Sequence, residues 1–517
     1  MLASANEICW PVQQETEEQL TRFLAEKYNL RVRRTHPYRE ELQHGFIHGQ
    51  RYGADVFKDI DPDAPLIVLL TAWQYSHHIA TSLYHHRAPI LILANFSGTY
   101  PGLVGALNLE GSLTGLDVPY ARLWSENFDD DFFYDKFDEW IRTGAIRHDL
   151  SYLQPAGDDH ASLDTPGGRL GTQLGDYVLN HKEIMGLFDS YCMGMMNGVF
   201  PQKSITAIGM PLESLSQSAL LYEMEKVPED LREACLQFYL DRGMDFRFGD
   251  DPENDLSPEQ VKEQCAMMIA AARIAERFGC TSVGIQYQKG LKDCCAASDF
   301  AEGALNSTER FPIPDEDGNI IREGEPIPCI NEVDMGSGIP QTMLFRILRT
   351  LGLPSETTLH DVRWGSDYEG TFYWDFEISG SVPFEHLKNG IAGAIGHRQA
   401  KMYFPFGGST ISGQGKKGRF VWARAFYRNL DVHLHIGSGE AFELPEEEFQ
   451  RRLQGTTPVW PLMNCTLDGI TRDDLMAGHQ SNHITVAYVP EEHLQTVLHA
   501  MTAMAKRLGM VTWLAGQ

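Results

Sequence analysis

The chain has few of the features of membrane-bound or secreted proteins. No apolar run approaches the roughly 20 residues that a membrane-spanning helix needs. The longest apolar runs, at residues 66–72 and 89–94, have the length of strands. Residues 1–10 include Glu7 and no basic cluster, so they do not resemble a signal peptide. These absences predict a cytoplasmic protein.

Cysteine is scarce and follows no pattern. The 9 cysteines are scattered, with no C-x-x-C pair, which argues against a zinc knuckle and against a disulfide framework. Adjacent cysteines rarely form an unstrained bridge, so Cys294 and Cys295 are expected to be structural. The chain also lacks the G-x-S-x-G elbow, H-E-x-x-H, a Walker A loop and a convincing G-x-G-x-x-G, so it shows no common hydrolase, zinc-protease or nucleotide-binding motif.

Positive charge is in short supply. The chain has 43 Lys and Arg against 71 Asp and Glu, a net charge of −28. Such a protein repels phosphate backbones and anionic lipid surfaces, so neither nucleic acid nor a membrane is an expected partner. The composition, 43% hydrophobic and 22% charged, is typical of globular proteins. A length of 517 residues predicts between about two and four domains.

The chain reads as two alternating α/β blocks followed by a β-rich region. Short apolar strands separated by helical segments predict parallel sheets covered by helices. In the first block the strands are expected at 65–73, 89–96 and 117–124, and residues 155–171, rich in Pro, Gly and Asp, are interpreted as a linker. In the second block we expect a helix at 257–278 ended by Gly279, strands at 282–288 and 327–333, and a helix at 339–351.

The residue pattern of the sequence changes after residue 353. Aromatic and β-branched runs at 371–378, 419–428 and 432–436 are separated by Gly-rich turns, and a helix is expected at 491–508. This pattern predicts an antiparallel, β-rich domain. The predicted domains are therefore 1–160, 161–353 and 354–517.

Polar side chains stand at the ends of three apolar strands, where open α/β sheets bind ligands. They lie in residues 284–302, which include Asp299 and Glu302, in residues 331–334, and in residues 480–483. Each has a structural alternative: Asp299 and Glu302 have capping-box spacing, Asp334 could be a turn residue, and His483 could be a core histidine. Taken together, Glu302, Asp334 and His483 could hold a hard divalent cation such as Mn²⁺ or Mg²⁺.

The same segments resemble the L-fucose isomerase family, which is related to the arabinose isomerases. Residues 284–302 are similar to its G-(I/F)-x-x-Q-x-x-x-x-D-x-x-x-x-x-D-x-x-E segment, and residues 302–307 to its E-A-I-L-N-S. Residues 332–335 and 361–363 resemble its E-N-D-S and D-V-R. Shorter matches are Trp73-Gln74-Tyr75 to W-C-Y, Met193-Gly194-Met195 to M-G-(I/M), Trp460-Pro461 to W-P and Asn482-His483 to N-H. The ordered matches extend from about residue 65 to 508.

The resemblance implies a fold, an assembly and a site. The fold would be two Rossmann-like domains followed by a β-rich, barrel-like domain, and the assembly a homo-hexamer. Glu302, Asp334 and His483 would bind one Mn²⁺, with Mg²⁺ or Co²⁺ as possible substitutes, and Glu302 and Asp334 would move the proton. Trp73 would line a neighbouring subunit's sugar site, and Gln288, Trp460 and Asn482 would contact the sugar.

The implied activity is aldose–ketose isomerisation through a cis-enediol. A divalent cation stabilises the developing oxyanion, and carboxylates take and return the proton. The sequence differs from the family pattern in three places. His479 stands where the family has a Trp, residues 189–192 differ from the family's small-residue segment, and there is no clear N-terminal arginine motif. D-arabinose, another deoxy or modified hexose, or an unusual aldose is therefore as plausible a substrate as L-fucose. The alternatives are a non-catalytic sugar-binding protein and a metal-dependent epimerase or aldolase.

Overall fold

The computed structural model describes residues 3–100, 102–157, 159–251, 253–401 and 403–517. The chain divides into two compact units. Unit 1 contains Met1–Leu150, Gly194–Asn197 and Asp473–Asn482; unit 2 contains Ser151–Met193, Gly198–Arg472 and His483–Gln517. Both units mix helices with strands, so the α/β class with parallel sheets is confirmed.

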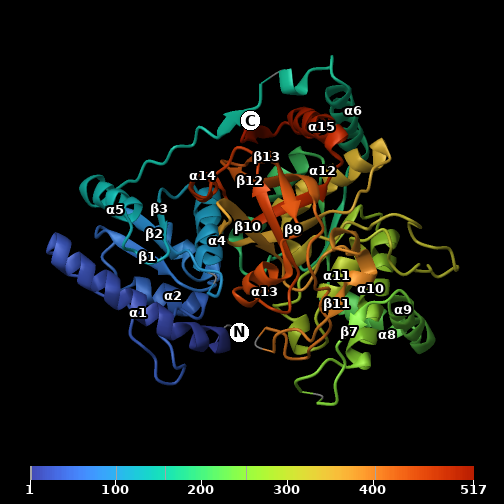
Figure 1. Cartoon of the computed structure of the whole chain (residues 1–517), viewed down its shortest axis with the longest axis horizontal. Helices are drawn as coiled ribbons and strands as arrows, with labels where there is room; N and C mark the ends of the chain where they lie inside the picture. The colour runs from blue at the N-terminus through green and yellow to red at the C-terminus, as the bar shows by residue number, and fades with distance from the viewer. Residues whose placement is uncertain (1–2, 101, 158, 252, 402) are drawn as a thin grey trace. The chain divides into compact units, whose positions relative to one another are not determined.

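Unit 1 is built on a parallel sheet of order β1-β2-β3 (Figure 1). Along β2, Ile90 and Ile92 join one apolar core, whereas Leu91 and Leu93 join another. Because successive side chains point to opposite faces of a strand, both faces of this sheet are buried, as the apolar sequence predicts. The elements are α1 (Ala3–Tyr28), α2 (Gln50–Phe57), β1 (Leu66–Leu70), α3 (Ala80–Leu83), β2 (Ile90–Asn95), α4 (Gly102–Gly115), β3 (Ala121–Ser125), α5 (Asp131–Thr143) and most of α14 (Arg472–Gly478).

Unit 2 contains a second parallel sheet, of order β6-β5-β8. Its largest helix, α10 (Pro258–Arg277), begins with a capping box between Ser257 and Gln260. The helix is followed by Gly279 at φ 63°, a backbone angle that glycine adopts without strain. The other elements of this region are β5 (Met185–Phe188), α7 (Gln202–Ala207), β6 (Leu212–Leu215), α8 (Gln217–Lys226), α9 (Glu229–Asp241), β7 (Asp245–Phe246), β8 (Ser282–Ile285) and α11 (Asp299–Leu305).

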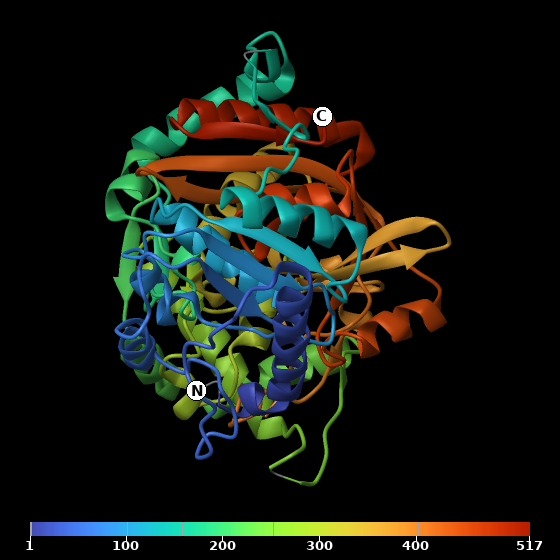
Figure 2. The ribbon, with the colours of Figure 1, turned by 90° about the vertical axis from the view of Figure 1, so that its left-hand side faces the viewer.

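The rest of unit 2 contains a separate two-stranded parallel sheet of β7 and β11 and a mixed sheet of order β12-β15-β9-β10-β14-β13-β16-β4, with a further pairing between β12 and β13. That pairing joins the six strands from β12 to β13 into a ring of antiparallel neighbours. Figure 2 shows α15 running alongside β16. The elements are β4 (Leu153–Pro155), α12 (Met335–Leu351), β9 (Thr358–Tyr368), β10 (Thr371–Glu377), β11 (Ile395–Gly396), β12 (Gly418–Arg428), β13 (Asp431–Phe442), α13 (Glu446–Gln454), β14 (Leu462–Leu467), β15 (His483–Tyr488), α15 (Leu494–Arg507) and β16 (Val511–Ala515).

Two expected segments differ from the sequence-based prediction. Residues 155–171 are only partly a linker, because α6 (Pro166–His181) begins inside them with Thr165 as its N-cap. Its glycines allow close packing: a Cβ on Gly171 would lie 2.1 Å from the carbonyl oxygen of Ala500 in α15. Residues 327–333 form a single bridge between Cys329 and Val283 and then a 3₁₀ turn, Asn331–Val333, in place of a strand.

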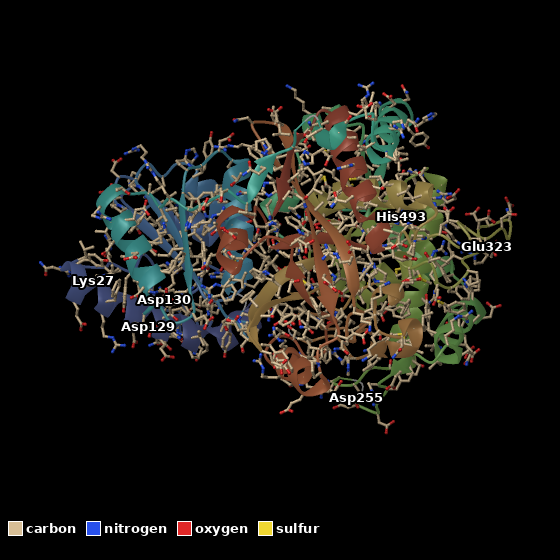
Figure 3. The ribbon with its side chains drawn as sticks, turned by 45° about the horizontal axis from the view of Figure 1, so that its top comes forward. Lys27, Asp129, Asp130, Asp255, Glu323 and His493 are labelled. Atoms are coloured by element: carbon tan, nitrogen blue, oxygen red, sulfur yellow. The ribbon has the colours of Figure 1, made fainter. Side chains whose placement is uncertain are left out.

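Charged side chains such as Lys27, Asp129 and Glu323 are exposed (Figure 3). All nine cysteines are free thiols. No helix in the described ranges has the length and apolar character needed to cross a membrane.

Candidate functional site

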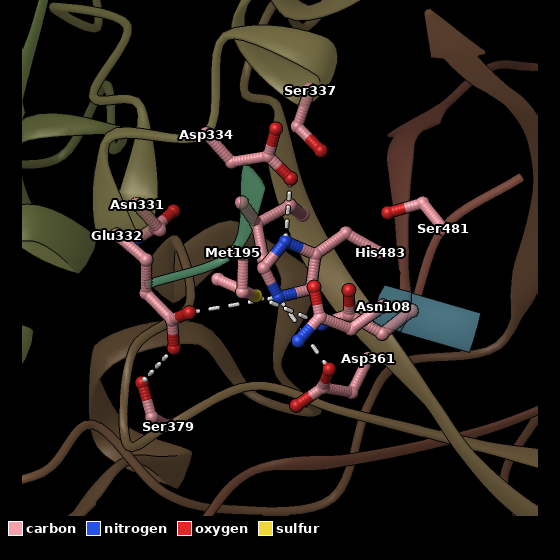
Figure 4. Close-up of polar contacts among 12 residues, drawn as sticks. Asn108, Met195, Asn331, Glu332, Asp334, Ser337, Asp361, Ser379, Ser481 and His483 are labelled. Atoms are coloured by element: carbon pink, nitrogen blue, oxygen red, sulfur yellow. Dashed lines mark hydrogen bonds and ion pairs between the residues drawn. The ribbon is translucent and has the colours of Figure 1, made fainter. Parts of the chain in front are cut away.

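His483 is fixed at the beginning of β15. It pairs across the antiparallel ladder with Asp361 of β9, and its side chain is 1% exposed. Its Nδ1 donates to Oδ2 of Asp334 over 2.6 Å. This bond orients the imidazole and directs Nε2 the other way (Figure 4). A histidine that ligates a metal commonly has its second ring nitrogen held by a carboxylate in this manner.

Asp334 is the anchor of this arrangement. It is the N-cap of α12, where Oδ1 accepts the backbone N–H of Gly336 over 2.8 Å. Oδ2 accepts from both His483 and the buried Arg424. Burial by itself would raise the pKa of Asp334, but the Arg424 guanidinium and His483 hold it well below its usual range. Asp334 is therefore an ionised carboxylate, each of whose oxygens already accepts a hydrogen bond.

Nε2 of His483 faces two carboxylates. It lies 3.6 Å from Oε2 of Glu332 and 3.4 Å from Oδ1 of Asp361 (Figure 4). Glu332 stands in the 3₁₀ turn with φ 55°, and Val333 follows at φ 53°. Two consecutive non-glycine residues at positive φ are costly and are concentrated at functional sites. Ser379 Oγ donates to Oε1 of Glu332 over 3.1 Å and fixes its carboxylate.

Glu302 completes the acidic group. It lies in α11, is 4% exposed, and accepts from Nδ2 of Asn331 over 2.8 Å. Its capping alternative is not realised, since the N-cap of α11 is Ser298 and makes no side-chain cap bond. Asp299, one turn earlier and also 4% exposed, has an Oδ2 that accepts no hydrogen bond from a described residue. We refer to Asp299, Glu302, Glu332 and Asp361 as the carboxylate cluster.

Burial disfavours the ionised form of carboxylates in this cluster. Burial raises the pKa of Glu302 to about 7, against the hydrogen bonds from Ser298 and Asn331. Burial also raises the pKa of Glu332 to about 7, with Asp361 acting in the same direction and His483 in the opposite one. Buried carboxylates held together in this way favour either protons or a cation. The pKa of His483 is raised: burial opposes this, but the hydrogen bond to Asp334 and the charge of Asp361 outweigh it.

The donor atoms around Nε2 of His483 are of the types that a hard divalent cation prefers. Two ligand atoms that are each about 2.1 Å from one ion lie roughly 3.0 Å apart at a right angle and about 3.4 Å apart at a tetrahedral angle. The separations from Nε2 of His483 to Glu332 and Asp361, 3.6 and 3.4 Å, are close to this range. Carboxylate oxygens with one imidazole suit Mn²⁺ or Mg²⁺. Among the residues described, no group of three or more His, Cys, Asp or Glu side chains already stands as a formed metal site.

The predicted sugar contacts fall in different places. In unit 2, Gln288 follows β8, is 7% exposed, and its amide makes no hydrogen bond to a described residue. Trp460 Nε1 donates to Gln399 over 2.9 Å, and Gln399 in turn donates to the carbonyl of Ser379, the residue that holds Glu332. Trp460 is thus connected to the carboxylate cluster through two residues.

Trp73 and Asn482 belong to unit 1. The indole N–H of Trp73 has no acceptor among the described residues. Asn482 Oδ1 accepts from Asn197 over 3.5 Å, and its Nδ2 lies 3.4 Å from the sulfur of Met195. Both residues stay predicted contacts.

Sequence reasoning did not single out Glu332 and Asp361. Glu332 lies two residues before Asp334, and only its backbone conformation turns its side chain toward His483. Asp361 was noted as part of the D-V-R match alone. Its position depends on the register between β9 and β15, which places it opposite His483. The periodicity of the sequence does not determine the register between these two strands.

No family model matches this sequence, and no curated protein sequence matches it. The resemblance to the L-fucose isomerase family thus depends on the sequence motifs alone.

Proposed function

We propose that the protein is a metal-dependent aldose–ketose isomerase of the L-fucose isomerase type, acting on a fucose-like, arabinose-like or modified sugar. The observation that carries this proposal is the arrangement around His483. One ring nitrogen is held by an ionised Asp334, while the other faces Glu332 and Asp361 within 3.6 Å. A histidine that only packed in the core would have no need of two further carboxylates at its second nitrogen.

In this proposal the cation is Mn²⁺, with Mg²⁺ or Co²⁺ as substitutes, held by Glu302, Glu332, Asp361 and Nε2 of His483. A divalent ion bound there supplies Lewis-acid stabilisation of the substrate oxygens O1 and O2. Asp334 orients His483. We assign it this role in place of the ligand and proton-transfer roles that the family resemblance implies, because its oxygens are already engaged by Gly336, Arg424 and His483.

The proton is carried by the chain's own carboxylates. Isomerisation takes a proton from C2 of the aldose and returns one to C1 of the enediol. A general base must be ionised to accept a proton. Without a cation, burial raises the pKa of Glu302 and Glu332 to about 7, and a divalent ion held by both would lower these pKa values and keep the two carboxylates ionised. Glu302 is the first candidate for the base that takes the proton from C2. Glu332 is the candidate for the group that exchanges a proton with the second of the two substrate oxygens.

A panel of aldoses assayed with Mn²⁺, before and after chelation, tests the function. In D₂O an isomerase that exchanges its proton with solvent places deuterium at C1 of the ketose. Turnover that is abolished by chelation and restored by Mn²⁺ supports the proposal. Cleavage of the sugar into two fragments would indicate an aldolase, and a change at one stereocentre an epimerase. Saturable sugar binding without turnover would indicate a sugar-binding protein.

The finer architecture belongs to the same proposal. We propose that residues 1–160 and 161–353 are Rossmann-like domains and that residues 354–517 are a barrel-like domain. We also propose that the chain acts in the cytoplasm as a homo-hexamer. Native mass spectrometry of the purified protein measures the assembly directly.

A further inference from the structure

A β-bulge lies beside the carboxylate cluster. Along the β9–β10 ladder, Asp361 pairs with Glu377 and Val362 with Phe376, but the next pair joins Trp364 to Asp375. Arg363 is therefore the extra residue of β9, with no partner on β10. A bulge of this kind redirects a side chain and is common next to active sites.

Arg363 is a buried cation with unused donors. The residue is 6% exposed, and its Nε lies 3.2 Å from Oε2 of Glu377. Its two terminal nitrogens, Nη1 and Nη2, donate to no described residue. Nε itself is buried and makes no hydrogen bond to a described residue, and a buried donor without an acceptor is costly. Such a group is expected where a ligand supplies the missing acceptors.

Glu377 holds the guanidinium in place. It is 1% exposed, and its Oε1 accepts the backbone N–H of Thr457 over 3.1 Å. Burial raises the pKa of Glu377 to about 7, while Arg363 acts against this. The carboxylate is thus fixed by the backbone on one side and by Arg363 on the other, so Arg363 is a pre-oriented donor.

The position of Arg363 suits the far end of an open-chain sugar. Asp361, which faces His483, lies two residues before Arg363 on the same strand. Two residues of an extended strand span about 7 Å. A sugar with C1 and C2 at the carboxylate cluster would extend its distal carbons over a comparable distance.

The charges around Arg363 determine which kind of chemical group can bind there. Glu377 already balances the charge of Arg363, and Asp361 and the rest of the carboxylate cluster are acidic. A phosphate or carboxylate would add negative charge to this region, whereas a hydroxyl oxygen accepts hydrogen bonds without doing so. We propose that Arg363, positioned by Glu377, binds a hydroxyl oxygen at C3 or beyond in the open-chain sugar and contributes to substrate specificity. This inference rests on the proposed function.

Calorimetric titration of the Mn²⁺-loaded protein with open-chain polyols tests the assignment. The probes are D-arabinitol, L-fucitol and their monodeoxy forms, which lack one distal hydroxyl each. The variants are Arg363→Met and Arg363→Lys. Arg346→Met is the matched control, because it removes an arginine from another Arg–Glu pair of unit 2, with Glu183 at 2.6 Å. Mn²⁺ affinity is measured for every variant.

We expect Arg363→Met to weaken polyol binding roughly 10- to 100-fold, the range for a lost hydrogen bond to a charged group, with Mn²⁺ affinity unchanged. Removing the contacted hydroxyl should weaken binding to the wild type but not to Arg363→Met. Arg346→Met should bind every polyol as the wild type does. If Arg363→Met fails to fold, Arg363→Lys decides, since it keeps the charge beside Glu377 but loses the planar guanidinium.

Two negative results have different meanings. Wild-type protein that binds polyols, with the same affinity in both Arg363 variants, overturns the assignment of Arg363 alone. Wild-type protein that binds Mn²⁺ but neither binds a polyol nor converts any aldose overturns the proposed function and this inference with it.

Discussion

Asp334→Asn is the sharpest perturbation that the site offers. Asp334 is 1% exposed and forms an ion pair with Arg424, which is 0% exposed. It also accepts the Nδ1 hydrogen of His483. The substitution removes the charge and leaves the shape nearly unchanged. The asparagine places an amide N–H₂ or a neutral oxygen at the position where Oδ2 of Asp334 accepts from Arg424 and His483.

Two magnitudes follow from these contacts. Removing one partner of a buried ion pair costs about 3–5 kcal/mol, because the other charge stays buried without compensation. The free energy of unfolding should fall by that amount. Loss of the carboxylate that orients a metal-binding histidine costs about 10- to 100-fold in metal affinity. The Mn²⁺ dissociation constant should rise by that factor.

The assays are urea unfolding of the metal-free protein and Mn²⁺ titration followed by electron paramagnetic resonance. Asp375→Asn is the matched control: Asp375 is an equally buried aspartate, paired with Arg452 at 3.1 Å. It should keep its Mn²⁺ affinity and lose less stability, because Arg452 stays paired with Glu448 at 2.6 Å. Equal loss of Mn²⁺ affinity in the two variants would refute the reasoning. If Asp334→Asn loses more affinity than Glu332→Gln, Asp334 is the ligand that the family resemblance implies.

The stability difference should also depend on pH. The pKa of Asp334 is held well below its usual range in the folded protein, against the effect of burial, by Arg424 and His483. A carboxyl group with a depressed folded pKa contributes stability that is present above its unfolded pKa, near 3.9, and is lost as the pH falls through the folded value. The difference between wild type and Asp334→Asn should therefore shrink below about pH 4. It should also fall as pH rises through the pKa of His483, because, against the effect of burial, Asp334 raises that pKa in the wild type.

Three further substitutions have distinct outcomes. Glu302→Gln should lower turnover at least about 100-fold while circular dichroism shows an intact fold; appreciable residual isomerisation would exclude Glu302 as the base. His483→Ala should weaken Mn²⁺ binding, and unchanged metal content after dialysis would contradict a ligand role. Burial and the charge of Glu356 raise the pKa of Glu385 from 4.5 to about 7, so wild-type stability should fall as pH rises through this interval. Glu385→Gln should remove the part of that dependence due to Glu385 and be more stable at pH 8 by on the order of 2 kcal/mol, which unfolding curves of the two proteins at pH 5 and pH 8 can check.

Local features of the fold could be predicted because they depend on neighbours in the chain. The apolar run of β2 indicates a strand buried on both faces, and its side chains do alternate between two cores. Helix α10 lies within residues 257–278 and is followed by Gly279, as expected. Two glycines of residues 155–171 were misleading, since Gly167 and Gly171 allow close packing against α15.

Some residues of the candidate site could likewise be predicted from the sequence, and others could not. From its residue types and strand-end positions the sequence singled out Glu302, Asp334 and His483, and a hydrogen bond directly joins two of them. Glu332 and Asp361 came from the tertiary structure, one through a turn with positive φ and the other through the register of β9 against β15. Residue type and spacing are properties of the sequence. The direction of a side chain across a ladder is decided only when distant strands pair, because it depends on contacts between residues more than 100 positions apart.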